Sequence, residues 1–393
     1  MKKTFYITTT LPYVNSDPHV GFAAELIRAD VIARVKSLQG FEVFFNTGTD
    51  EHGQKLLNDA KKSGRDVKEY VDEYAEKFRA LESLLGISKD VHFIRTTDTH
   101  HQTAAQEFWR RCDKNGFIYK KTYQAKYCVG CELEKTDSEL VDEHCSLHPK
   151  LDIEIIEEEN YFFKFSEFQN KLLDLYEKNP MLVIPDFRFN EIKSFVKSGL
   201  QDFSISRLKS KMSWGVEVPG DKEHTMYVWF DALVNYISTL GWPEDNDNFQ
   251  KFWVNGTPIQ YCGKDNLRQQ SAMWQAMLMA ADLPATHNIV IDGFVTGNGG
   301  IKMSKSLGNV INPSDVVSEY GTDALRYFSL RELHPFEDSP FTMERFKESY
   351  NANLANGIGN LTSRIMKMAE NNLMGSVEIT EQDDLAEYYA LFE

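Results

Sequence analysis

Two blocks of alternating strand and helix patterns, separated by a stretch without this alternation, constrain the fold of this chain most strongly. In the first block, a strand pattern at residues 4–10 is followed by helical spacing over residues 22–38 and a buried strand pattern at residues 42–47. An N-cap pattern at Asp66 then opens a helix that ends at Gly86. Because successive strands joined by helices pair in parallel, we predict an α/β fold with a Rossmann-type, doubly wound parallel sheet.

The stretch from residue 117 to residue 225 interrupts this pattern and contains a cysteine cluster, an acidic run and hairpin-like strands. We interpret it as an inserted domain with a metal knuckle at residues 126–150. The alternation then returns, with strands at 226–229, 259–262 and 288–291 and helices at 231–240 and 266–281. The chain becomes largely helical after residue 305. The predicted boundaries are 1–116 and 226–325 for the two halves of the sheet domain, 117–225 for the insert, and 326–350 and 351–393 for two C-terminal segments.

Length and composition fit a protein of two or three domains. The chain has 393 residues, of which 42% are hydrophobic and 26% charged. It contains no run of 18 apolar residues, and its first residues predict a strand and not a signal peptide, so we expect no association with a membrane. The net charge of −16 argues only weakly against nucleic-acid binding, because one local basic patch can bind RNA. The sequence leaves open whether the protein is a monomer or a homodimer.

Three of the five cysteines are clustered, which indicates a metal site. Cys128 and Cys131 are followed by Cys145 and His148, a spacing that allows four tetrahedral ligands around zinc. Four protein ligands leave no open position, so this zinc would be structural. The alternative is a small hydrophobic cluster of reduced thiols. An odd cysteine count without a secretion signal favours a reducing, cytoplasmic compartment. Two further thiols are expected to be buried: Cys112 and Cys262.

Two widely separated segments contain the residue types of a phosphate site. The first, around His19 and Gly21, lies where the first helix begins. A helix N-terminus offers free N–H groups and the positive end of its dipole, His19 can donate to a phosphate, and Gly21 allows an adenine to approach the backbone. In the second segment, glycines precede Lys302 and Lys305, whose compact charges can converge on a triphosphate. The alternatives are a capping or packed histidine and a solvated basic loop.

Together, these segments resemble the two signatures of class I aminoacyl-tRNA synthetases. Residues 19–22, His-Val-Gly-Phe, are similar to the first signature (HIGH), and residues 302–306 are identical to the second (KMSKS). The resemblance runs from residue 4 to about residue 370. Further segments resemble the methionyl-tRNA synthetases in particular, namely residues 11–13, 47–53, 205–207, 228–232 and 263–265. This resemblance implies a methionine–tRNA ligase that activates L-methionine with ATP and transfers it to tRNA(Met).

The resemblance also implies roles for individual residues. Those expected to bind methionine are Leu11, Tyr13, Asp50, Trp229, Ala232, Tyr236, Asn266 and Gln270, with Asp50 on the ammonium group. Those expected to bind ATP are His19, Gly21, Gly263, Asp265, Lys302, Ser304 and Lys305. Those expected to contact tRNA are Arg207, Asn360 and Arg364. The knuckle of this family often has four cysteines, so His148 would be a variant ligand.

The implied chemistry needs no general base, because the methionine carboxylate that attacks the α-phosphorus of ATP is already an anion. We expect Lys302 and Lys305 to hold the β- and γ-phosphates as their loop closes. His19 is expected to stabilise the pentacoordinate phosphate, with Mg²⁺ bridging phosphate oxygens. These three residues are the candidate catalytic residues. An insert of this size predicts no separate editing domain.

Some positions depart from the family pattern. Phe22 replaces the second histidine of the first signature, and Asn266 and Gln270 replace an apolar residue and a histidine of the methionine pocket. Residues 351–371 resemble the first helix of an anticodon-binding bundle, so we expect a piece of a longer protein, ending at Glu393 before the bundle closes. Three alternatives stay open: a class I synthetase for another amino acid, a nucleotidyltransferase that adenylylates a small acid, and a catalytically weakened or truncated paralogue.

Overall fold

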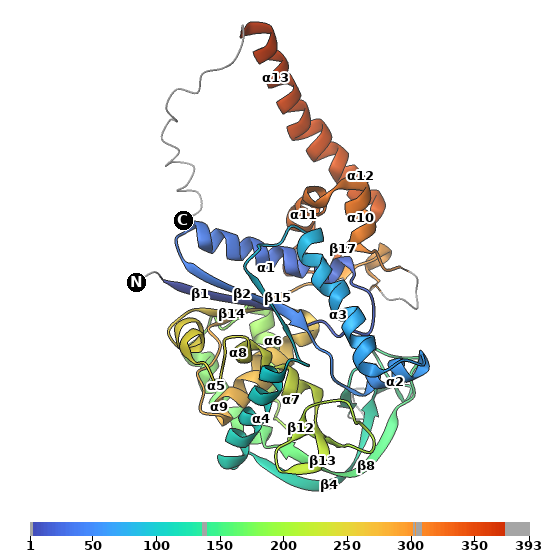
Figure 1. Cartoon of the computed structure of the whole chain (residues 1–393), viewed down its shortest axis with the longest axis vertical. Coiled ribbons are helices and arrows are strands. Elements are labelled where there is room, and N and C mark those ends of the chain that lie inside the picture. Colours follow the sequence, from blue (N-terminus) through green and yellow to red (C-terminus); the bar gives the residue numbers. More distant parts are fainter. Residues whose placement is uncertain (1–2, 136–139, 302, 304–308, 374–393) are drawn as a thin grey trace.

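The computed structural model describes residues 3–135, 140–301, 303 and 309–373. At its centre lies a six-stranded parallel sheet with the order β3-β2-β1-β14-β15-β9 (Figure 1). Its strands are β1 (Thr4–Thr9), β2 (Glu42–Thr49), β3 (Val91–Arg95), β9 (Val183–Ile184), β14 (Pro258–Gly263) and β15 (Asn288–Asp292). The strand order reverses between β1 and β14, so the predicted doubly wound sheet is confirmed.

Helices cover both faces of this sheet because successive strand residues point to opposite sides. In β1, Phe5 and Ile7 belong to one hydrophobic core and Tyr6 to the other. The first core is covered by α1 (Val20–Leu38), α3 (Val67–Leu84) and α11 (Thr322–Arg331), and the second by α4 (Thr99–Lys114), α8 (Asn235–Ser238) and α9 (Trp274–Ala280). The predicted cap of α3 is present, because the Asp66 carboxylate accepts from two N–H groups of the first turn. Between β2 and α3 lies α2 (Gln54–Lys62).

The predicted insert has one part outside the central sheet and one part inside it. A long antiparallel hairpin of β4 (Ile118–Cys128) and β8 (Glu154–Phe163) carries the predicted metal knuckle at its tip. The short strands of the knuckle are β5 (Leu133–Lys135), β6 (Leu140–Val141) and β7 (His144–Cys145). Further along, α5 (Gln169–Lys178) and α6 (Asp186–Lys197) flank β9, which pairs in parallel with β15. Residues 117–225 are therefore not an independent unit, because they supply an edge strand to the central sheet.

The strand predicted at residues 226–229 is wrong. Met226 ends β13 (Asp221–Met226), which pairs with β11 (Ser206–Leu208) and β12 (Glu217–Val218) in a small antiparallel sheet. The chain then continues directly into α7 (Val228–Ala232) and α8. Aromatic and β-branched residues suggested a strand here because α7 is almost wholly buried, which removes the polar face that identifies a surface helix. The helix predicted at 266–281 is not one continuous α-helix. It consists of a 3₁₀ turn (Lys264–Asn266), a π-helical turn (Gln269–Met273) and α9.

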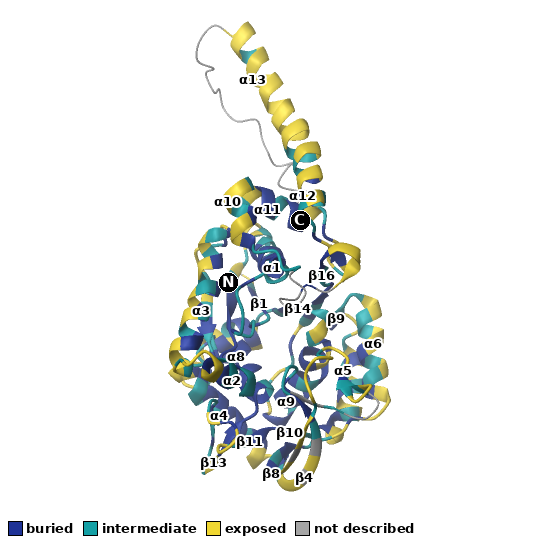
Figure 2. Ribbon diagram, turned by 90° about the vertical axis from the view of Figure 1, so that its right-hand side faces the viewer, coloured by how far each residue is buried: buried dark blue, intermediate teal, exposed yellow. Residues whose placement is uncertain are grey.

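The C-terminal part of the described chain is helical, as predicted. After the strand pair β16 (Val295–Thr296) and β17 (Ser339–Pro340), α12 (Met343–Ser349) continues through a π-helical stretch (Tyr350–Gly359) into α13 (Asn360–Asn372). The remaining helix of this part, α10 (Pro313–Tyr320), precedes α11. The α13 helix projects away from the body of the molecule and is exposed along nearly its whole length (Figure 2). None of the helices in the described ranges is both long and apolar enough to cross a membrane.

Candidate active site

Predicted site residues gather where the parallel strands end and the strand order reverses. The strands β1, β2 and β14 run in the same direction, so the loops that follow them share one edge of the sheet. His19 lies between β1 and α1, Asp50 directly follows β2, and Asp265 follows β14. The fold therefore brings these three residues, which are far apart in the sequence, to one edge.

Asp50 is a buried carboxylate, 6% exposed, beside the loop that follows β1. Its backbone N–H donates to Pro12 O (3.0 Å), and Val14 N donates to Asp50 O (3.2 Å), so Tyr13 is bridged to Asp50. Among the residues that the structure describes, no donor bonds to Asp50 Oδ1. Burial, and then the charge of Asp231, raises the pKa of Asp50 well above its usual value. This arrangement suits a cationic ligand that donates to the buried oxygen.

A buried charged network connects the loop of Asp50 to α7. Asp231 Oδ2 lies 2.6 Å from His52 Nδ1, and Asp231 Oδ1 lies 2.8 Å from His101 Nε2. The other nitrogen of His101 lies 2.9 Å from Ser238 Oγ. Burial disfavours the charge of Asp231, but the charge of His52 and the hydrogen bonds of both imidazoles outweigh burial and lower the pKa of Asp231 to about 2.

This network fixes the predicted pocket residues of α7, Trp229 and Ala232, relative to Asp50. Ala232 is buried, and the Trp229 indole N–H is also buried without a hydrogen-bond partner in the described part of the chain. Sequence reasoning missed the role of the two histidines of the network. The signal that was available is a histidine two positions after Asp50, but nothing in the sequence paired it with Asp231.

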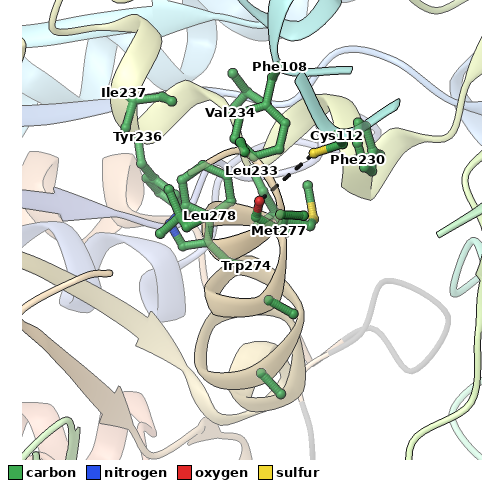
Figure 3. Packing of buried hydrophobic residues seen from close by; sticks show 14 of the residues in the cluster. Phe108, Cys112, Phe230, Leu233, Val234, Tyr236, Ile237, Trp274, Met277 and Leu278 are labelled. Carbon is green, nitrogen blue, oxygen red and sulfur yellow. Dashed lines mark hydrogen bonds between the residues drawn. The ribbon is translucent and has the colours of Figure 1, made fainter. Parts of the chain in front are cut away.

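Tyr236 and Gln270 lie in a buried chain of hydrogen bonds. Gln270 Nε2 donates to the Tyr236 hydroxyl (2.5 Å), and Gln270 Oε1 accepts from Gln260 Nε2 (2.6 Å). Burial raises the pKa of Tyr236 well above its usual value. The glutamine that departs from the family pattern is therefore hydrogen-bonded to a predicted pocket residue. Around it, the ring of Tyr236 meets Trp274 edge to face, with centroids 5.9 Å apart (Figure 3).

The two thiols that were expected to be buried are buried. Cys112 lies in the same hydrophobic cluster, where its Sγ is 3.9 Å from Met277 O (Figure 3). Cys262, in β14, is equally enclosed. Burial raises the pKa of both thiols well above the usual value, so neither is a ready nucleophile.

His19 caps α1 with its own side chain. Its Nδ1 accepts from Gly21 N (3.0 Å), which places the ring proton of the neutral imidazole on Nε2. A Cβ at position 21 would lie 2.8 Å from this ring, so the cap requires a glycine there. The prediction of free N–H groups at this helix end is partly wrong. Gly21 N donates to His19 Nδ1, and Val20 N donates to Ile311 O (3.1 Å). An anion here would meet His19 Nε2 and the helix dipole.

The second signature lies largely outside the described residues. Lys302, Ser304 and Lys305 are among the residues that the structure does not describe. Met303, between them, is buried in the core that also contains α1. The bond from Val20 N to Ile311 O brings the chain that follows the second segment to the start of α1.

Phe22, the departure from the first signature, is a packing residue. Its ring meets Phe78 of α3 edge to face, with centroids 5.4 Å apart. It therefore attaches α1 to α3, and its position gives no donor to a phosphate.

Residues predicted to bind ATP follow β14. A Cβ on Gly263 would lie 2.9 Å from Asp265 Oδ1. Asn266, predicted to line the methionine pocket, donates to Asp265 Oδ1 (3.3 Å) and so contacts the predicted ATP side.

Sequence reasoning missed Glu25, a buried residue of α1 whose pKa is raised to about 8, mainly by burial. Its signal was a carboxylate in the middle of an apolar helical run. Asp292, another carboxylate at this edge, adds to the shift.

The three residues predicted to contact tRNA lie in different environments. Asn360 and Arg364 are exposed and one turn apart on α13, so they share a face. Arg207 is buried, its Nη1 donates to Ser204 Oγ (2.7 Å), and its guanidinium lies 4.9 Å from the centre of the Tyr127 ring. The described contacts of Arg207 are internal to the protein, and its burial removes it from direct reach of a surface-bound RNA.

The four predicted metal ligands converge at the tip of the hairpin. Their ligand atoms all lie within 4.8 Å of one another. Cys131 Sγ is 3.4 Å from Cys145 Sγ and 3.2 Å from His148 Nδ1, and Cys128 Sγ is 3.8 Å from the same nitrogen. Tetrahedral zinc holds sulfur and nitrogen ligand atoms roughly 3.5–3.8 Å apart, so the set fits. A hydrogen bond from Cys131 lowers the pKa of Cys128 well below its usual value, which makes one thiolate ready for a metal.

Comparisons with known proteins agree with this arrangement. Residues 5–145 and 130–366 match a family described as tRNA synthetases class I (M). The chain is 44% identical over 374 residues to methionine–tRNA ligase of Thermotoga maritima, a match that covers 94% of this chain and 58% of the relative. It is 43% identical over 392 residues to methionine–tRNA ligase of Rickettsia bellii, covering 100% of this chain and 75% of the relative.

Solved structures give the same result. Methionyl-tRNA synthetase of Mycobacterium tuberculosis in complex with methionyl-adenylate matches with a TM-score of 0.90 and 39% identity. That match covers 98% of this chain and 76% of the other. The chain thus spans less than two thirds of the Thermotoga relative and about three quarters of the other two proteins.

Proposed function

Because this chain belongs to the class I methionyl-tRNA synthetase family, we propose that it activates L-methionine with ATP and transfers it to tRNA(Met). The observation that carries the proposal is the buried oxygen of Asp50, which has no donor in the described part of the chain. The ammonium group of methionine supplies such a donor. The thioether of methionine is apolar and polarizable and packs well on aromatic rings. Tyr13 and Trp229 are aromatic residues of the predicted pocket.

In the first half-reaction, the methionine carboxylate attacks the α-phosphorus of ATP. A P–O bond forms, the bond to pyrophosphate breaks, and methionyl-adenylate results without removal of a proton. His19 Nε2 would donate to an oxygen of the α-phosphate, where negative charge develops. Gly263 and Asp265 would contact the ribose, and ATP would carry the Mg²⁺ that screens the phosphates. Lys302 and Lys305 stay candidates for the β- and γ-phosphates.

In the second half-reaction, a ribose hydroxyl of the terminal nucleotide of tRNA attacks the adenylate carbonyl, and AMP leaves. The exposed pair Asn360 and Arg364 supports a tRNA contact along α13. The burial of Arg207 supports a role inside the protein in place of the contact predicted for it.

We further propose that the cluster of three cysteines and His148 binds zinc. Four ligands would close the coordination shell, so the ion would cross-link the tip of the β4–β8 hairpin and take no part in the reaction. Reduced thiols at these positions fit a cytoplasmic compartment.

The decisive experiment is amino-acid-dependent exchange of labelled pyrophosphate into ATP, with all twenty amino acids and without tRNA. Exchange with methionine alone is the expected result, because this half-reaction needs the methionine pocket and the ATP side but no contact with tRNA. Exchange with another amino acid would overturn the pocket assignment, and no exchange in folded, zinc-loaded protein would overturn the activity. Charging of tRNA(Met) is then measured separately.

A further inference from the structure

Glu132 joins the metal knuckle to the methionine side of the site, although it immediately follows the ligand Cys131. It is 4% exposed. Its carboxylate is not one of the clustered ligand atoms in the described knuckle. Its backbone has φ of 51°, a conformation that residues other than glycine rarely adopt. A strained backbone of this kind persists only where surrounding contacts hold it.

The contacts that hold Glu132 come from three separate elements. Its Oε1 accepts from the Tyr13 hydroxyl (3.1 Å) and from Lys55 N at the start of α2 (2.7 Å). Its Oε2 accepts from the hydroxyl of Tyr127, at the end of β4. The guanidinium of Arg207 stacks on the Tyr127 ring, so a positive charge lies behind this hydroxyl. The buried carboxylate is thus satisfied by groups that belong to the pocket on one side and to the hairpin on the other.

On the pocket side, Glu132 packs against the loop that contains Asp50, the predicted ammonium ligand. Tyr13 is bridged through its backbone to Asp50. Gly53, three residues later, has φ of 124°, and a Cβ there would lie 3.0 Å from Glu132 Oε1 and would clash with the Tyr13 hydroxyl. Glu132 and Tyr13 therefore close over this glycine and leave no room for a side chain.

We propose that Glu132 is a positioning residue that ties the metal knuckle to the methionine pocket by holding Tyr13, an inference that rests on the function proposed above. Cys128 and Cys131 set the turn that points Glu132 inward. A metal bound by these thiols would hold the turn, and Glu132 would pass that constraint to Tyr13. Affinity for methionine therefore depends on the knuckle, while the ATP side, at the end of β14, does not.

The test compares Glu132→Ala with Glu143→Ala in the full chain. Glu143 lies in the same knuckle, also has a positive φ (63°) and is exposed, so both changes carry the same backbone effect and only one removes the buried carboxylate. Methionine binding without ATP is measured by calorimetry, KM and kcat by pyrophosphate exchange, and zinc by elemental analysis. We expect Glu132→Ala to weaken methionine binding and raise its KM about tenfold, the usual effect of losing a hydrogen bond to a charged group. The KM for ATP, the zinc content and the Glu143 variant should stay at wild-type values.

A second pair of variants covers the case in which Glu132→Ala loses its metal. Glu132→Gln weakens the acceptor of the Tyr13–Glu132 bond by removing its charge, and Tyr13→Phe removes the donor. Because no bond is left to weaken in Tyr13→Phe, the double variant should bind methionine no more weakly than the weaker single variant. Additive losses, or wild-type methionine affinity in Glu132→Ala with zinc retained, would overturn the inference. If the wild-type protein binds methionine and the variants bind it with the same affinity, only the role of Glu132 is refuted. A wild-type protein that does not bind methionine refutes the proposed function as well.

Discussion

The buried network around Asp231 makes a quantitative prediction for Asp231→Asn. Asparagine keeps the shape of the side chain but removes its charge and places an amide NH₂ opposite one imidazole. The pKa of Asp231 is lowered from 3.8 to about 2 in the folded protein. Since one pKa unit corresponds to about 1.4 kcal/mol, the folded state prefers the charged form by roughly 2–3 kcal/mol. The carboxylate is fully buried, so solvent does not reduce this figure.

The sign of this contribution follows from the lowered pKa. A carboxyl group whose pKa falls on folding stabilises the protein above the unfolded pKa of 3.8, and this stability is lost as the pH falls through the folded value of about 2. At neutral pH the whole contribution is present. Asp231→Asn should therefore lose roughly 2–3 kcal/mol of local stability. Methionine binding should also weaken, because α7 carries Trp229 and Ala232.

Hydrogen exchange measured by mass spectrometry at pH 7 reports this loss directly, because the protection of the amides in α7 and α8 falls when these helices are destabilised. A loss of roughly 2–3 kcal/mol lowers the protection of their amides by one to two orders of magnitude. The matched control is Asp247→Asn, the same chemical change at an exposed position, which should leave protection unchanged. If α7 in Asp231→Asn keeps wild-type protection, the charge of Asp231 does not stabilise this helix, and the prediction is refuted.

Three further predictions concern the reaction, the metal and the pH. Lys305→Ala should slow pyrophosphate exchange by at least tenfold with little change in methionine Kd, since its proposed contact is with phosphates; an unchanged exchange rate would refute the role. Removing the metal with a chelator should lower hydrogen-exchange protection at the tip of the β4–β8 hairpin and leave β14 and β15 protected; equal loss in both would show that the metal acts on the whole fold. Because the pKa of Asp50 is raised and binding of an ammonium favours the carboxylate, methionine Kd should fall as pH rises towards that pKa, and the dependence should be lost in Asp50→Asn; a pH-independent Kd would contradict it.

The sequence predicted the sheet well because its strands and helices have strong local patterns. The expected strand at residues 4–10 and the helix capped by Asp66 correspond closely to β1 and α3. Prediction failed at residues 226–229, where burial on all sides removes the periodicity that separates a helix from a strand. It also failed for β9, whose two residues are too short to form a pattern and join the sheet only through the tertiary structure.

The site was predictable where one residue acts through its own chemistry, and not where residues act in pairs. The cluster of three cysteines and His148 could be predicted from its spacing, and Asp50 became a candidate through its resemblance to a family residue. The partners Asp231 and His52 are 179 positions apart, and Glu132 and Tyr13 are 119 apart. A single sequence contains no signal for such pairs, because nothing local to either residue depends on the other.

These pairs also support the proposal that Asp50 binds a cation. The carboxylates Asp231, Glu132 and Glu51 lie near Asp50, and their negative charges favour a cation beside it. Asp231 is met by two imidazoles, Glu51 accepts from Arg95 at 2.6 and 2.8 Å, and Glu132 accepts from two tyrosine hydroxyls.

Within the described residues, only Asp50 among these four carboxylates has an oxygen that is buried and without a donor. A ligand with an ammonium group would complete the set, because it adds the positive charge and the donor that this oxygen lacks. Burial, and then the field of the neighbouring carboxylates, raises the pKa of Asp50, and the same field attracts the ammonium. Substitutions that remove a supporting charge, such as Asp231→Asn, therefore act on affinity in two ways, through the position of α7 and through the field at Asp50.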